Sequence, residues 1–173
     1  PVTYTDILVK VAASALRRHP EVNSSFREDG IHVLEDVNIG IAVAVPGGLM
    51  VPVIRNADRK GLMSIAGERA GLVEKARKGI LGPGDVGGGT FTISNLGVKD
   101  VEWFCPIINP PEAAILGVGR IAPRAVVREG QVVARLTAYF TLVFDHRVLD
   151  GVAASGFLES LKTLTENPVM LLA

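Results

Sequence analysis

Apolar positions recur at helical spacing in three stretches of the chain. Residues 6–19 carry apolar side chains on one face and end in a basic turn before a proline, and Thr5 can cap their start. Residues 64–78 repeat this pattern and end at Gly79, a common stop signal. Residues 152–167 form the third amphipathic stretch, again followed by a proline. The pattern therefore predicts three helices.

Runs rich in β-branched and aromatic residues predict strands between these helices. The predicted strands are residues 37–45, 49–54, 90–94, 113–118 and 136–144. Residues 126–133 predict a hairpin that turns at Glu129 and Gly130. The first two strands are apolar at nearly every position, so we expect both of their faces to be covered. The mixed order of elements predicts an α+β fold, with a mixed sheet covered by helices on one side.

Composition narrows the classes of protein that fit this pattern. The chain has 173 residues, 48% of them hydrophobic, and a formal net charge of zero, which supports one domain with a sizeable core. Balanced charge argues against a nucleic-acid surface or a polybasic membrane patch, and no apolar run is long enough to span a bilayer. The single cysteine, Cys105, excludes an internal disulfide and fits a reducing compartment.

A histidine between two aspartates stands where the last predicted strand turns into the last predicted helix. Asp145, His146 and Asp150 lie in the stretch DHRVLDG, directly after residues 136–144. Loops held by rigid elements often carry chemistry, and histidine is suited to accept a proton near neutral pH. His146 is therefore a candidate general base. Taken alone, His146 could equally be a buried structural histidine, and Asp150 could simply cap the following helix.

Other polar groups give weaker signals. Cys105 is a rival nucleophile, but its phenylalanine and proline neighbours form an apolar setting that disfavours a thiolate, so we expect it to pack in the interior. His19 and His32 lie at a helix end and in a polar turn, and we expect both on the surface. The histidines and the cysteine lack metal-ligand spacing, so no metal site is predicted. The glycine-rich residues 82–89 lack the ending of a phosphate-binding loop and predict a connection.

Three sequence blocks in this order resemble the catalytic domain of dihydrolipoamide acyltransferases, the E2 core components of 2-oxo acid dehydrogenase complexes. The blocks are TFTISNLG at 90–97, IINPPEAAILG at 107–117 and the HxxxDG motif HRVLDG at 146–151. The HxxxDG motif alone is shared with chloramphenicol acetyltransferases, whereas the three blocks together are specific. The resemblance extends along the whole chain and is closest to the acetyl-transferring branch of pyruvate dehydrogenase complexes.

The resemblance implies a fold and an assembly. The fold is the two-layer sandwich of chloramphenicol acetyltransferase, in homotrimers that build a cubic or dodecahedral core and bind the E1 and E3 components. Residues 1–173 would be one catalytic domain truncated at its N-terminus, without the lipoyl and subunit-binding domains and without the arginine that pairs with the aspartate of HxxxDG. Residues 161–172 would anchor one trimer to the next. The implied location is the bacterial cytoplasm or the mitochondrial matrix.

The resemblance also assigns roles to residues. An acyl group, acetyl in the branch named above and branched-chain acyl or succinyl in others, moves between dihydrolipoyl-lysine and coenzyme A. His146 is then the general base, Ser94 stabilises the tetrahedral oxyanion and Asp150 orients the loop that carries His146. The matching positions for coenzyme A contacts are Ser94, Asn95, Gly119, Ile121 and Thr3. Ser94 could instead be an ordinary serine at a strand end.

Two alternatives remain at this point. The chain could be a non-catalytic scaffold subunit of the same complex, although scaffold relatives lack the histidine found here as His146. It could also be a stand-alone chloramphenicol-type acetyltransferase, against which the first two blocks argue. Since the family places its sites between subunits, we expect Ser94 and His146 of one chain to lie apart.

Overall fold

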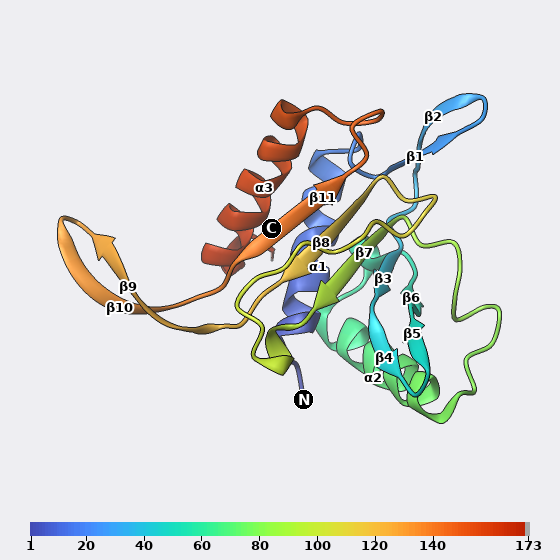
Figure 1. The fold of residues 1–173 in the computed structure, drawn as a ribbon, viewed down its shortest axis with the longest axis horizontal. Coiled ribbons are helices and arrows are strands. Elements are labelled where there is room, and N and C mark those ends of the chain that lie inside the picture. The colour runs from blue at the N-terminus through green and yellow to red at the C-terminus, as the bar shows by residue number, and fades with distance from the viewer. Residues whose placement is uncertain (172–173) are drawn as a thin grey trace.

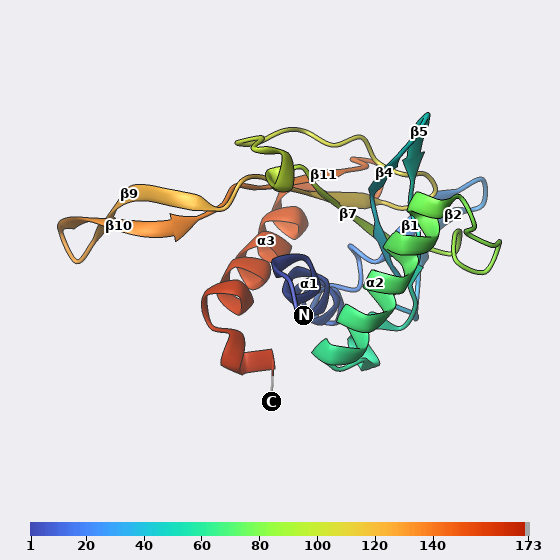
Figure 2. The same cartoon turned by 90° about the horizontal axis from the view of Figure 1, so that it is seen from below.

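The computed structural model describes residues 1–171 and shows two layers (Figure 1). One layer is a sheet, and the other consists of α1 (Tyr4–Arg18), α2 (Leu62–Lys78) and α3 (Gly151–Glu166), all on the same face of that sheet (Figure 2). This arrangement confirms the predicted α+β fold with helices on one side. Short 3-10 helices occur at Ala57–Arg59, Gly97–Lys99 and Pro168–Leu171.

The helix ends follow local capping chemistry. α1 begins earlier than expected, because Thr3 rather than Thr5 is its N-cap and both the amide and the hydroxyl of Thr3 donate to Asp6 Oδ2 at 2.7 Å. α2 ends as predicted at Gly79, which adopts the left-handed conformation with φ 69°. Asp150 caps α3, and this part of the prediction is confirmed.

The main sheet has the strand order β11-β8-β7-β3-β6. β7 runs parallel to both β3 and β8, whereas β6 and β11 are antiparallel edge strands, so the sheet is mixed as predicted. Phe91 of β7 meets Phe157 of α3 at a ring-centroid distance of 5.5 Å, and both side chains are fully buried between the layers. The strands of this sheet are Ile39–Ile41 (β3), Val53–Ile54 (β6), Phe91–Asn95 (β7), Ala114–Val118 (β8) and Phe140–Phe144 (β11).

Three strands predicted as continuous are broken. The first two split so that β4 (Val43–Val45) and β5 (Gly48–Met50) form their own hairpin beyond the main sheet. The expectation of two covered faces therefore holds for β3, which is fully buried, and is wrong for β5, where Leu49 is 62% exposed. The run 136–144 also breaks at Tyr139, because its carbonyl accepts from Gly119 N instead of continuing the neighbouring hairpin.

Two further hairpins extend from the main sheet. β9 (Ala122–Arg128) and β10 (Gln131–Thr137) turn at Glu129 and Gly130 as predicted, since both residues have positive φ, 51° and 77°. This arm projects far from the body of the molecule (Figures 1 and 2). β1 (Ser24–Arg27) and β2 (Gly30–Val33) form a second hairpin that the sequence reasoning missed, although its Asp-Gly dipeptide is a hairpin signal. No helix within residues 1–171 is long and apolar enough to cross a membrane.

Candidate active site

His146 lies on a short loop that is fixed on both sides. The loop leaves β11 at Phe144, and the amide of Asp145 still donates to Ala113 O at 2.8 Å, which extends the strand pairing by one residue. On the other side Leu149 is buried in the core, with 3% of its surface exposed. His146 itself is exposed, and its ring lies 5.6 Å from the ring of Phe144 between centroids. An exposed imidazole on an anchored loop can meet a substrate from solvent.

The two aspartates of the motif have different tasks. Asp150 accepts from Ala153 N at 2.8 Å and so fixes the point where the loop becomes α3. Its role in orienting the His146 loop through an arginine stays a prediction. Asp145 instead forms a local ion pair with Arg147, whose Nη2 lies 2.6 Å from Asp145 Oδ2. The amide of Arg147 also donates to Asp145 Oδ1, and these hydrogen bonds from Arg147 lower the pKa of the Asp145 carboxyl.

Ser94 lies at the opposite end of the sheet, beside the start of α1. Ser94 is half-buried near the end of β7, and Asn95 Nδ2 donates to the hydroxyl of Thr5 at 3.2 Å. Asn95 Oδ1 accepts from Gly97 N, which closes a turn directly after the strand. The start of α1 therefore lies next to two predicted contact residues. Thr3 belongs to this end too, but its hydroxyl is already committed to Asp6.

Gly119 and Ile121 follow β8 at this same end. Gly119 is buried, and a Cβ built on it would lie 2.0 Å from the carbonyl oxygen of Glu102, so a side chain does not fit there without a backbone shift. A Cβ built on Gly97 would in turn lie 2.4 Å from Gly119 O. These contacts hold the turn after β7 tightly against the end of β8. Ile121 is half-buried just before the β9–β10 arm.

Ser94 and His146 of one chain do not meet. The register places Ser94 opposite Gly117, and Gly117 opposite Thr141. His146 follows Thr141 by five residues along β11 and the loop, which at ~3.3 Å per residue is an offset of roughly 16 Å along the strand direction, in addition to the separation between β7 and β11. The predicted separation of the two side chains within one chain is therefore supported by the sheet register.

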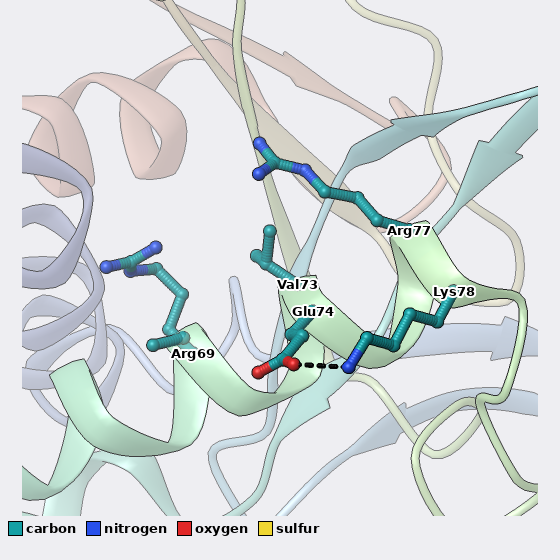
Figure 3. A pocket seen from close by; sticks show the side chains of 6 residues that line it. Arg69, Val73, Glu74, Arg77 and Lys78 are labelled. Carbon is teal, nitrogen blue, oxygen red and sulfur yellow. Dashed lines mark hydrogen bonds and ion pairs between the residues drawn. The ribbon is translucent and has the colours of Figure 1, made fainter.

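Two surface hollows within residues 1–171 are lined by neither Ser94 nor His146. One lies on α2, lined by six side chains that include Arg69, Val73 and Arg77, and it contains none of the predicted site residues (Figure 3). The other is lined by Glu102, Trp103, Tyr139, Phe140 and Thr141. Since Thr141 shares its row of the sheet with Ser94, the second hollow lies toward the Ser94 end.

Two predictions about the remaining candidates are wrong. Cys105 is exposed rather than packed, because the extended segment that carries it crosses the face of the sheet opposite the helices, where Pro106 rather than Cys105 packs against Gly117. His19 is half-buried rather than on the surface, with Nε2 2.8 Å from Ser160 Oγ and its ring edge-on to Phe157. His32 stays near the surface and pairs with Asp29. Within residues 1–171 no group of three or more His, Cys, Asp or Glu side chains could hold a metal ion.

Comparison with known proteins adds the family context. The family model described as 2-oxoacid dehydrogenases acyltransferase (catalytic domain) matches residues 1–173. The dihydrolipoyllysine-residue acetyltransferase component of the pyruvate dehydrogenase complex of Bacillus subtilis is 43% identical over 173 residues, and the chain spans 39% of its length. The cubic core of a pyruvate dehydrogenase multienzyme complex superposes with a TM-score of 0.96 at 40% identity, over 99% of this chain and 72% of that one.

A second solved relative bears on the candidate residues. Dihydrolipoamide acetyltransferase of Azotobacter vinelandii, studied for the role of a serine, a histidine and an asparagine in its catalytic mechanism, superposes with a TM-score of 0.96 at 40% identity, over 99% of this chain and 72% of that one. Its serine and histidine have the same separation in sequence as Ser94 and His146, and its asparagine follows the histidine at the spacing of Asp150. Chloramphenicol acetyltransferase shares the fold, with a TM-score of 0.58 at 14% identity over 93% of this chain and 77% of that one.

Proposed function

The chain belongs to the 2-oxoacid dehydrogenase acyltransferase family, whose catalytic-domain model it matches from end to end, and we propose that it transfers an acetyl group between a dihydrolipoyl thiol and coenzyme A. The observation that carries this proposal is His146, exposed on a loop anchored by β8 and α3 and spaced from Ser94 as in the Azotobacter enzyme. Coenzyme A is a substrate in this reaction, and the lipoyl group is carried on a separate domain.

The chemistry follows from the weakness of a neutral thiol as a nucleophile. The imidazole of His146 takes the proton of the coenzyme A thiol, and the thiolate attacks the carbonyl carbon of the acetyl-dihydrolipoyl thioester. The carbonyl oxygen becomes an oxyanion, which the hydroxyl of Ser94 stabilises by donating a hydrogen bond. The intermediate collapses by breaking the bond to the dihydrolipoyl sulfur, and that sulfur takes the proton back from His146.

This mechanism requires two chains, because within one chain the sheet register offsets His146 from Ser94 by roughly 16 Å along the strands, and β8 lies between their two strands. A site at a subunit contact brings His146 of one chain to Ser94 of its neighbour. The coenzyme A side of the site is then formed by the turn at Ser94 and Asn95, the backbone of Gly119 and the start of α1. Similarity to a cubic core supports trimers assembled into a larger core that binds lipoyl domains and the E1 and E3 components. The relatives named above from bacteria support a cytoplasmic location.

The test is transfer of acetyl groups from acetyl-coenzyme A to dihydrolipoamide, measured for the wild type and for His146→Ala. Loss of a general base commonly lowers rates by about 10²–10⁴-fold, so kcat should fall in that range. His32→Ala is the matched control, because His32 lies near the surface of the β1–β2 hairpin, and it should keep wild-type rates. Full activity in His146→Ala would remove His146 from the mechanism.

The scaffold alternative makes a different prediction in the same assay. A non-catalytic core subunit would assemble into a particle of many chains and show no transfer in either protein. Light scattering beside the activity assay therefore separates the two functions.

A further inference from the structure

The β1–β2 hairpin reaches the loop that carries His146. The guanidinium carbon of Arg147 lies 4.1 Å from the centroid of the Phe26 ring, in the geometry of a cation–π contact. Phe26 belongs to β1, about 120 residues earlier in the chain, and its partner in the hairpin is Ile31. This contact has no part in the chemistry proposed above.

We propose that Phe26 is a positioning residue for His146, acting through Arg147. The proposal rests on the proposed role of His146 as base. The ring of Phe26 confines the Arg147 side chain, Arg147 confines the turn that it forms with Asp145, and His146 is the residue between them.

The hairpin is fixed relative to the loop by backbone contacts. Ser24 O accepts from Ala113 N at 2.9 Å, and Ala113 O in turn accepts from Asp145 N at 2.8 Å. Ser25 also forms an isolated bridge with Glu112. β1, the start of β8 and the His146 loop are therefore joined in one hydrogen-bonded row, so the ring of Phe26 has a defined place beside Arg147.

Arg147 is bound to a single carboxylate by both its backbone and its side chain. Its amide lies 2.9 Å from Asp145 Oδ1, its Nε 3.0 Å from the same oxygen and its Nη2 2.6 Å from Oδ2. The side chain of Arg147 is 66% exposed and that of Asp145 20%, and holding a long exposed side chain in one geometry costs conformational entropy that offsets much of the ion pair. An aromatic face over the guanidinium restricts the freedom of the Arg147 side chain. The turn then keeps one conformation, and His146 keeps one direction.

Catalysis depends strongly on such positioning, because small displacements of a reacting group lower the rate. Phe26→Leu keeps an apolar side chain but removes the aromatic face, and should lower kcat by about two- to fivefold, the size of an exposed cation–π contact. KM should not change, since Phe26 is not placed at the bound substrate. Phe26→Tyr keeps the aromatic face and should keep kcat. Ile31→Leu, on the opposite strand of the same hairpin, is the matched control and should behave as wild type.

The test combines kinetics with a readout that needs no activity. NMR of the intact protein labelled only at histidine Cε1 gives one signal per histidine, and His146→Ala identifies that of His146. Phe26→Leu should broaden or split this signal, whereas Phe26→Tyr and Ile31→Leu should leave it single. In the Arg147→Gln background, Phe26→Leu should have no further effect on the signal or on kcat.

An unchanged His146 signal in Phe26→Leu overturns the proposal. It is also overturned if Phe26→Leu lowers kcat equally in the wild-type and Arg147→Gln backgrounds. If the wild type shows no acetyl transfer, or if His146→Ala stays active, the proposed function fails, and the NMR arm still decides whether Phe26 orders His146.

Discussion

At the scale of single residues, Glu112 is a buried acid that the proposed mechanism does not use. It is 5% exposed and accepts hydrogen bonds from the hydroxyl of Thr92 at 2.6 Å and from the amide of Asn109 at 3.1 Å. Burial raises the pKa of Glu112 above its ordinary value of 4.5, and the two hydrogen bonds offset only part of that rise. The folded state therefore holds the proton of Glu112 more tightly than the unfolded state.

The free energy of unfolding depends on pH because the pKa of Glu112 differs between the folded and unfolded states. Since the folded-state pKa of Glu112 is raised, its contribution to stability is complete below pH 4.5 and is lost as the pH rises through the folded value. Glu112→Gln should be about as stable as wild type at pH 4 and more stable at pH 7, measured by urea unfolding across that range. Glu159→Gln on the exposed face of α3 is the control. If the free energies of unfolding of the wild type and of Glu112→Gln changed in parallel with pH, this account would be contradicted.

Sequence reasoning at this scale succeeded where a role depends on neighbours in the chain. Asp150 caps the next helix because its carboxylate reaches an amide three residues ahead, and such spacing is visible in the sequence. Whether a side chain is buried cannot be predicted in this way, because burial depends on segments that are distant in the sequence. His19 is half-buried because Phe157 and Ser160 of α3 come to it, and Cys105 is exposed because its segment crosses the outer face of the sheet.

At the scale of elements, one buried ion pair joins α1 to α2. Asp6 has no exposed surface, and its Oδ1 lies 2.6 Å from Nε of Arg69, whose side chain is 17% exposed. Burial alone would raise the pKa of Asp6, but hydrogen bonds from Arg69 and Thr3 outweigh it and lower the pKa below 3.8. The same carboxylate also receives the amide and the hydroxyl of Thr3, so it fixes the start of α1 as well as the contact with α2.

Asp6→Asn should destabilise the fold by about 3–5 kcal/mol, because it leaves the Arg69 cation largely buried without its partner. Since the folded-state pKa of Asp6 is lowered, its contribution is present above pH 3.8 and disappears as the pH falls through the folded value. The free energies of unfolding of the wild type and of Asp6→Asn, measured with denaturant, should therefore converge as the pH is lowered. Glu74→Gln, which breaks the exposed Glu74–Lys78 pair on α2, should have no measurable effect. A similarly small effect of Asp6→Asn would contradict the anchoring role.

Element prediction worked where one periodicity persists and failed where tertiary contacts interrupt it. The three helices and the turn at Glu129 and Gly130 follow from local signals alone. The break at Tyr139 follows from the hydrogen bond of its carbonyl to Gly119, which the run 136–144 does not reveal. The β1–β2 hairpin was missed because each strand has only four residues, and the hairpin is held by pairing with the residues before β8.

At the scale of the whole molecule, the isolated chain leaves apolar surface uncovered. The β9–β10 arm projects from the body and exposes Val127, Val132 and Leu136 at 69%, 73% and 65% (Figure 2). Apolar side chains grouped on a projecting arm are typical of protein interfaces. The segment 161–172, expected to anchor one trimer to the next, is described up to residue 171, and residue 172 lies outside the described residues. Leu161 and Leu164 are buried in the chain's own core, whereas Met170 is 42% exposed.

The whole-molecule account therefore depends on a site shared by two chains, and subunit mixing tests it directly. Ser94→Ala should lower kcat by about 10²–10³-fold and His146→Ala by about 10²–10⁴-fold when each is made alone. Chains of the two variants co-assembled in equal amounts should recover about a quarter of the wild-type activity, because about a quarter of the subunit contacts then pair an intact His146 with an intact Ser94. No recovery in mixed particles of normal size would show that both side chains act within one chain, and would contradict the central claim.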